Sequence, residues 1–91
     1  MTTVVRVPTQ LRTFTDGSDA VKADGSTVAE VIEDLERNHP GLRERILDES
    51  GALRRFVNLY LDDEDVRFLK GVETEIPEGA RLSIIPAVAG G

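Results

Sequence analysis

The stretch Thr27-Val28-Ala29-Glu30-Val31-Ile32-Glu33-Asp34-Leu35 contains the clearest helix pattern in the chain. Thr27 followed by Glu30 forms a capping box, in which each side chain binds a free backbone N–H at the start of a helix. Apolar residues then recur at the i, i+3, i+4 and i+7 spacing of one helical face: Val28, Val31, Ile32 and Leu35. Residues 38–41, Asn-His-Pro-Gly, end the pattern. We therefore predict one helix, starting near Thr27, that buries this face against a sheet.

Two strands are predicted before this helix. Residues 4–7 form a valine-rich run that ends at Pro8, and β-branched runs of this kind are typical of strands. Asp16-Gly17-Ser18 is a turn pattern, and residues 20–23 can form the return strand. Together these segments predict an antiparallel hairpin with a long loop.

After the helix, residues 42–47 are predicted to form a short helical turn that contacts the core, and residues 48–51 a loop. Arg54 and Arg55 then form a small basic spot, which is either a solvated edge or a docking point for an acidic patch. We favour the solvated edge. A short strand or extended piece is predicted at residues 66–69, and the last strand at residues 80–85.

The segment 56–61, Phe-Val-Asn-Leu-Tyr-Leu, alternates as a β-strand does. Val57, Leu59 and Leu61 are expected to face the helix, which leaves Phe56 and Tyr60 on the open face of the sheet. Ile85 of the last strand is expected to face the same way, whereas Leu82 and Ile84 face the core. Exposed apolar side chains there form either the core of a second layer or a binding patch. Because little chain is left for a second layer, we favour a binding patch, here called the open-face patch (Phe56, Tyr60 and Ile85).

Composition excludes several classes of function. The chain has 91 residues, which fits one domain, and a formal charge of -6, which argues against binding nucleic acid. No apolar run is long enough to span a bilayer and no secretory signal is visible, so we expect a cytoplasmic protein. Cysteine is absent, so a thiolate nucleophile is excluded. The four acids at 62–65 lack the ligand spacing of a calcium loop, and His39, the single histidine, is expected to lie at the helix end.

The last six residues, Pro86-Ala87-Val88-Ala89-Gly90-Gly91, are small and uncharged. Pro86 cannot donate a ladder hydrogen bond, so strand pairing should weaken there. We expect residues 1–86 to form the domain and residues 87–91 a flexible tail. Five extended residues reach about 17 Å, and glycine tolerates close approaches that other residues do not. Such a tail could place Gly91 inside a partner's active site, although a frayed terminus is the commonest fate of a chain end.

The predicted order is strand, strand, helix, strand, short strand, strand. This order gives an α+β fold with a mixed sheet and one main helix on one face, which is the β-grasp arrangement of ubiquitin. Over nearly its whole length the chain resembles the ubiquitin-like sulfur-carrier proteins of the ThiS/MoaD/CysO family. The resemblance rests on the tail, on Arg55-Phe56-Val57-Asn58 and on Asp63-Glu64-Asp65-Val66-Arg67-Phe68. The internal segments are more similar to the CysO type, the carriers of cysteine biosynthesis, than to typical ThiS proteins, which lack the insertion at residues 42–53.

The resemblance implies a mechanism centred on Gly91. An E1-like activating enzyme adenylates the Gly91 carboxylate with ATP and magnesium, and sulfur displaces AMP to leave a thiocarboxylate. Gly90 clears the channel, and we expect Val88 and Ala89 to contact partners together with the open-face patch. For the CysO type, the acceptor is an aminoacrylate on the pyridoxal phosphate of a cysteine synthase, and a metal-dependent peptidase then frees cysteine. Zinc, ATP and pyridoxal phosphate would belong to the partners. The carrier would be a monomeric co-substrate, not an enzyme, and would hold no cofactor or metal itself.

Two alternatives stay open. One is the small subunit of a molybdopterin synthase, the MoaD type, which would co-purify with a pterin-binding large subunit. The other is a ubiquitin-like modifier or binding module, in which Gly91 would form isopeptide bonds to lysines and give ladders in cell extract.

Overall fold

The computed structural model describes residues 2–55 and 57–86 of the chain. Within these residues it has five strands, two α-helices and three 3₁₀ helices. In chain order they are β1 (Thr2–Arg6), η1 (Thr9–Thr15), β2 (Ala20–Asp24), α1 (Val28–Asn38), α2 (Leu42–Ile46), β3 (Val57–Leu61), β4 (Glu64–Asp65), η2 (Val66–Phe68), η3 (Gly71–Glu73) and β5 (Arg81–Pro86).

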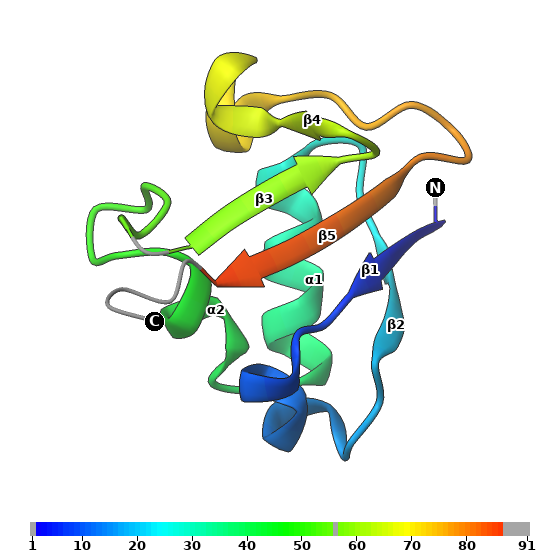
Figure 1. Ribbon diagram of the computed structural model, residues 1–91, viewed down its shortest axis with the longest axis vertical. Helices are drawn as coiled ribbons and strands as arrows, with labels where there is room; N and C mark the ends of the chain where they lie inside the picture. The colour runs from blue at the N-terminus through cyan, green and yellow to red at the C-terminus, as the bar shows by residue number, and fades with distance from the viewer. Residues whose placement is uncertain (1, 56, 87–91) are drawn as a thin grey trace.

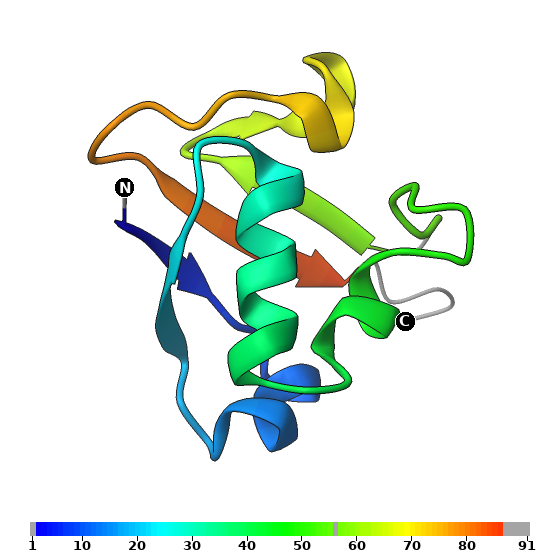
Figure 2. The same ribbon diagram turned by 180° about the vertical axis from the view of Figure 1, so that it is seen from behind.

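The strands form one mixed sheet with the order β2-β1-β5-β3-β4 (Figure 1). β5 is the central strand; it runs parallel to β1 and antiparallel to β3. α1 crosses one face of this sheet, as the view from behind shows (Figure 2). The predicted hairpin is present, because β1 pairs antiparallel with β2 from Thr2 opposite Asp24 to Arg6 opposite Ala20. The α+β fold, the β-grasp arrangement and the single main helix are thus confirmed.

The start of α1 has the predicted N-cap Thr27, and Glu30 reaches back one residue further than a capping box requires. Thr27 has an extended backbone, and its hydroxyl accepts a hydrogen bond of 3.2 Å from the Glu30 N–H. The Glu30 carboxylate accepts from the backbone N–H and the hydroxyl of Ser26, both at 2.8 Å, one residue before the cap. Gly25 has no Cβ to obstruct this approach, since an added Cβ would lie 2.8 Å from the Cβ of Glu30. At the other end His39 is the C-cap, as expected.

The core lies between α1 and the sheet, and α2 closes one end of it. The four predicted helix residues are all at most 1% exposed, and the five apolar strand residues expected to face them belong to the same buried cluster. Those five are Val57, Leu59, Leu61, Leu82 and Ile84, and Val5 of β1 belongs to the cluster as well. Leu42, Ile46 and Leu47 of the predicted helical turn are buried as well. The two apolar patterns, one with helical and one with strand spacing, therefore identified opposite walls of one core.

Two connections differ from expectation. The long loop of the hairpin contains the 3₁₀ helix η1, with Leu11 buried. The strand expected at residues 66–69 is wrong, because Val66–Phe68 is a 3₁₀ helix and the short strand is Glu64–Asp65. The reason is local: the Asp65 carboxylate accepts a hydrogen bond of 2.9 Å from the Arg67 N–H. This contact caps a helical turn and ends the pairing with β3.

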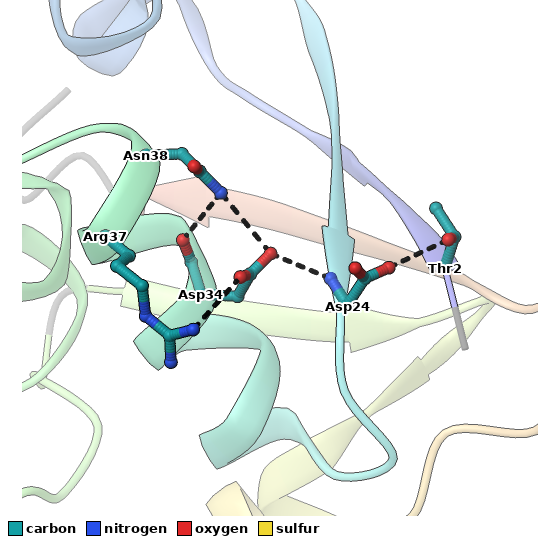
Figure 3. Close-up of polar contacts among 5 residues, drawn as sticks. All are labelled: Thr2, Asp24, Asp34, Arg37 and Asn38. Atoms are coloured by element: carbon teal, nitrogen blue, oxygen red, sulfur yellow. Dashed lines mark hydrogen bonds and ion pairs between the residues drawn. The ribbon is translucent and has the colours of Figure 1, made fainter.

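A polar network fastens α1 to the hairpin (Figure 3). The Asp34 carboxylate accepts a hydrogen bond of 2.9 Å from the Asp24 N–H at the end of β2, and Thr2 donates to the Asp24 carboxylate at 2.8 Å. On the helix, Asn38 donates to the Asp34 carboxylate at 3.4 Å and Arg37 lies 3.9 Å from it. One carboxylate thus links the helix to the edge strand β2.

Candidate functional site

The base of the tail is held by the central strand of the sheet. β1 pairs with β5 from Arg81 to Ser83, and β3 pairs with it from Leu82 to Pro86. The last pair places Val57, the first residue of β3, opposite Pro86. The pairing thus still includes Pro86, and whether it weakens there stays a prediction, because residues 87–91 lie outside the described residues. Of the predicted site residues, Phe56 and four tail residues lie outside the described residues: Val88, Ala89, Gly90 and Gly91.

Two members of the open-face patch lie on the predicted face. Ile85 is 44% exposed and stands opposite Asn58, and Tyr60 is half-buried and stands opposite Ser83. Tyr60 and Ile85 are therefore diagonal neighbours on the face away from α1, at a separation that aromatic side chains can bridge. The predicted orientation of these two residues is confirmed, and their role in docking stays a prediction.

A contact that the sequence did not predict joins η2 to the start of β3. The guanidinium of Arg67 donates hydrogen bonds to the side-chain oxygen of Asn58 and to the backbone carbonyl of Arg54. Arg54 in turn donates from Nε to the carbonyl of Glu44 in α2, at 2.6 Å. The residues beside the base of the tail are thus braced by two other elements. Local patterns could not reveal this, because the partners of Arg67 lie far from it in the sequence; the only hint was that residues 55–58 and 63–68 both carried the family resemblance.

The acidic run does not form a metal site in the described part of the chain. Asp62 and Asp63 are exposed turn residues, and Glu64 and Asp65 form β4. Asp62 accepts a hydrogen bond of 3.1 Å from the Arg81 N–H. Within residues 2–55 and 57–86, no three His, Asp or Glu side chains lie close enough together to hold a metal ion. None of the helices described there is long and apolar enough to cross a membrane.

Two carboxyl groups titrate below their ordinary range, and both hold turns together. The backbone N–H of Ser26 and then its hydroxyl lower the pKa of Glu30. The hydroxyl of Ser50, followed by the Ala52 N–H, lowers the pKa of Asp48 in the loop after α2. Both carboxylates accept hydrogen bonds from residues at most four positions away, so each acts within its own turn. Within the described residues, the support for the base of the tail is the paired strand β5.

Comparison with known proteins identifies the family of this chain. Residues 5–91 match the ThiS family. The sulfur carrier protein CysO of Mycobacterium tuberculosis is 50% identical over 93 residues, covering 100% of both chains. A chain from the crystal structure of the Amycolatopsis orientalis BexX/CysO complex superposes with a TM-score of 0.92 and 49% identity, covering 98% of this chain and 99% of that one.

A third relative is a protein of a different kind. The small archaeal modifier protein 3 of Haloferax volcanii is 35% identical over 68 residues, which covers 75% of this chain and 73% of that protein. The likeness to CysO is both stronger and complete in length, and it includes the tail. The chain therefore belongs to the ThiS family, as a sulfur carrier protein similar to CysO over its full length.

Proposed function

We propose that the chain carries sulfur as a thiocarboxylate on Gly91 and delivers it for cysteine biosynthesis. A sulfur carrier is a co-substrate of its partner enzymes, not an enzyme itself. The observation that carries the proposal is the match to CysO, since it extends over the complete length of both chains and so includes the Gly-Gly end. The absence of cysteine from the chain supports it, because no side chain can hold sulfur as a persulfide.

The proposed chemistry acts on one carboxylate. A free carboxylate is a poor electrophile, so an E1-like enzyme first joins the Gly91 oxygen to the α-phosphorus of ATP with loss of pyrophosphate. Sulfide then attacks the carbonyl carbon and AMP leaves with the oxygen. The product is a thiocarboxylate with an ionised, nucleophilic sulfur. No group of the folded domain needs to take part in these two steps.

The acceptor we propose is a cysteine synthase that uses pyridoxal phosphate, followed by a metal-dependent peptidase that frees cysteine and restores the carboxylate. These partners are proposed from the likeness to CysO. ATP, magnesium, zinc and pyridoxal phosphate would be held by the partners. Because the activation consumes ATP, we propose a cytoplasmic location. We also propose that the free carrier is a monomer.

The proposed contacts of the partners are the tail and the open-face patch. Gly90 would allow a partner's backbone to close around the chain where a Cβ would obstruct it. Val88 and Ala89 would contact the walls of the same channel. Tyr60 and Ile85 stand on the face beside the base of the tail, so an enzyme that encloses the tail can reach them too.

Mass spectrometry of the intact protein tests this function. After incubation with the activating enzyme, ATP, magnesium and a sulfur donor, the chain should gain the mass difference between sulfur and oxygen, and alkylation should trap it at Gly91. Deleting Gly91 or adding one residue after it should abolish loading, because displacements of about 1 Å can already cost about a hundredfold in rate. Gly90→Ala should slow loading and leave folding unchanged. A gain that persists without Gly91 would refute the proposal.

The likeness to the archaeal modifier protein 3 favours one second candidate. In that case the activated Gly91 carbonyl would be attacked by a lysine amine of another protein, forming an isopeptide bond. Extract blots with an antibody against the chain separate the two functions, since a modifier gives ladders of larger conjugates and a sulfur carrier gives one band.

A further inference from the structure

An exposed aromatic side chain lies outside the open-face patch. Phe68, the last residue of η2, is 87% exposed, and its neighbour Leu69 is 41% exposed. Both belong to the segment that projects beyond β4 at the upper edge of the sheet (Figure 1). Aromatic side chains contribute most to protein interfaces when they are large, accessible and held in place before binding. Phe68 meets the first two conditions.

The third condition is met by hydrogen bonds on both sides of Phe68. Before it, the Asp65 carboxylate accepts from the Arg67 N–H at 2.9 Å. After it, the Lys70 N–H donates to the hydroxyl of Thr74 at 3.0 Å, and Thr74 is buried. The backbone that carries Phe68 is therefore fixed at two points, and presenting the ring to a partner requires little further ordering.

The same segment is connected to the base of the tail. The Arg67 guanidinium binds Asn58 and the carbonyl of Arg54, and Asn58 stands opposite Ile85, just before the tail begins. A protein that encloses the tail therefore meets the edge of the sheet where Phe68 projects. Phe68 can extend the contact surface of a partner of the tail without moving any element.

Two segments of this edge differ in charge from the chain as a whole, whose formal charge is -6. In residues 53–58 and 65–70 the only acid is Asp65, whose carboxylate already caps η2. The neighbouring acids of the edge, Asp62, Asp63, Glu64 and Glu73, lie outside these two segments, so the positive charge is confined to them. The same residues contain four cations: Arg54, Arg55, Arg67 and Lys70. Such an edge fits a partner surface that carries carboxylates, by complementarity of charge. Arg54 and Arg55, the basic spot interpreted from the sequence as a solvated edge, are both exposed, and the docking role of this spot stays a prediction.

We propose that Phe68 inserts into an apolar socket, rimmed by carboxylates, on the enzyme that activates the tail. The inference rests on the proposed function. We choose the activating enzyme for a chemical reason. An acceptor can recognise the reactive thiocarboxylate itself. The activating enzyme, however, must distinguish this C-terminal carboxylate from those of all other protein chains. A tail of small residues offers few side chains for that choice, so selection has to use the folded domain.

The test is the ATP–pyrophosphate exchange that the activating enzyme catalyses with the full-length carrier. Phe68→Ala should raise the KM for the carrier about 30-fold, which corresponds to about 2 kcal/mol, and leave kcat near the wild-type value. Phe68→Leu, which keeps an apolar side chain, should recover most of the loss. Lys70→Glu should raise the KM at low ionic strength and approach the wild type at about 1 M salt, where the Debye length falls to about 3 Å.

Val4→Ala is the matched control, because Val4 is also an exposed apolar residue, 36% exposed, but lies on β1 across the sheet. It should leave KM unchanged, and all variants should keep the thermal midpoint of the wild type. A wild-type KM for Phe68→Ala would refute the proposed insertion of Phe68 and leave the proposed function standing. A rise in KM for Val4→Ala equal to that for Phe68→Ala would do the same. If the wild-type carrier supports no ATP–pyrophosphate exchange, both the proposed function and the proposed insertion of Phe68 are refuted. Lack of any effect of Lys70→Glu refutes the acidic rim.

Discussion

Replacing Leu35 by alanine tests the core that supports the tail. Leu35 is 1% exposed and belongs to the cluster that α1 shares with the sheet. The substitution removes three carbon groups, and at about 0.8 kcal/mol for each the lost transfer free energy is about 2.4 kcal/mol. An unfilled cavity adds about 24 cal/mol for each Å³ that remains. We therefore expect the free energy of unfolding to fall by about 2–5 kcal/mol.

Urea unfolding followed by far-ultraviolet circular dichroism measures this loss. For a domain of this size each kcal/mol lowers the midpoint temperature by about 4–8 °C, so thermal unfolding should show a decrease of at least about 8 °C. Arg37→Ala is the control on the opposite face of the helix, because the Arg37 side chain is 77% exposed and its only ion pair within residues 2–55 and 57–86 is 3.9 Å long. It should cost less than about 0.5 kcal/mol. A similarly small cost for Leu35→Ala would put Leu35 outside the core and refute the packing described above.

The remaining predictions concern acid stability and docking. The pKa of Glu30 is lowered in the folded chain, chiefly by the Ser26 N–H, so its contribution to stability is fully present above its ordinary value of 4.5 and is lost as the pH falls through the lowered pKa of the folded state. Glu30→Gln should therefore cost stability at pH 7 and little at about pH 3; an equal cost at both pH values in urea titrations would contradict this. Tyr60→Ala and Ile85→Ala should each weaken binding to the activating enzyme and leave the fold intact. Unchanged affinities by calorimetry for these two and for Phe56→Ala would exclude the open-face patch.

The sequence predicted the elements whose patterns are long or capped. The helix could be located to within a residue because Thr27 and Glu30 specify its start and four apolar residues specify its buried face. The alternation in residues 57–61 predicted which side of the sheet each residue faces, since a strand has a period of two. Each of these patterns contains enough residues for its period to be recognised.

The 3₁₀ helices could not be predicted in the same way. Val66–Phe68 has three residues, too few for any period, and its composition also suits a strand. What decides its conformation is one side-chain contact, from Asp65 to the Arg67 N–H. The hydrogen bonds from Arg67 to Asn58 and Arg54 could not be predicted either, because they depend on how β3 and η2 lie in space. The part of the site that sequence patterns missed is therefore the part made by contacts between segments.

The position of β5 explains why the length of the tail should matter more than its composition. Since β5 lies between β1 and β3, and pairs with β3 as far as Pro86, the point where the tail starts is fixed relative to the face on which we propose docking. Residues 87–91 would then set how far the carbonyl proposed to react lies from that face, about 17 Å if extended. One added residue would move it by about 3.4 Å, well beyond the displacement of about 1 Å that can already cost a hundredfold in rate. Anchoring the domain more firmly, through Tyr60, Ile85 and Phe68, would make this length constraint stricter.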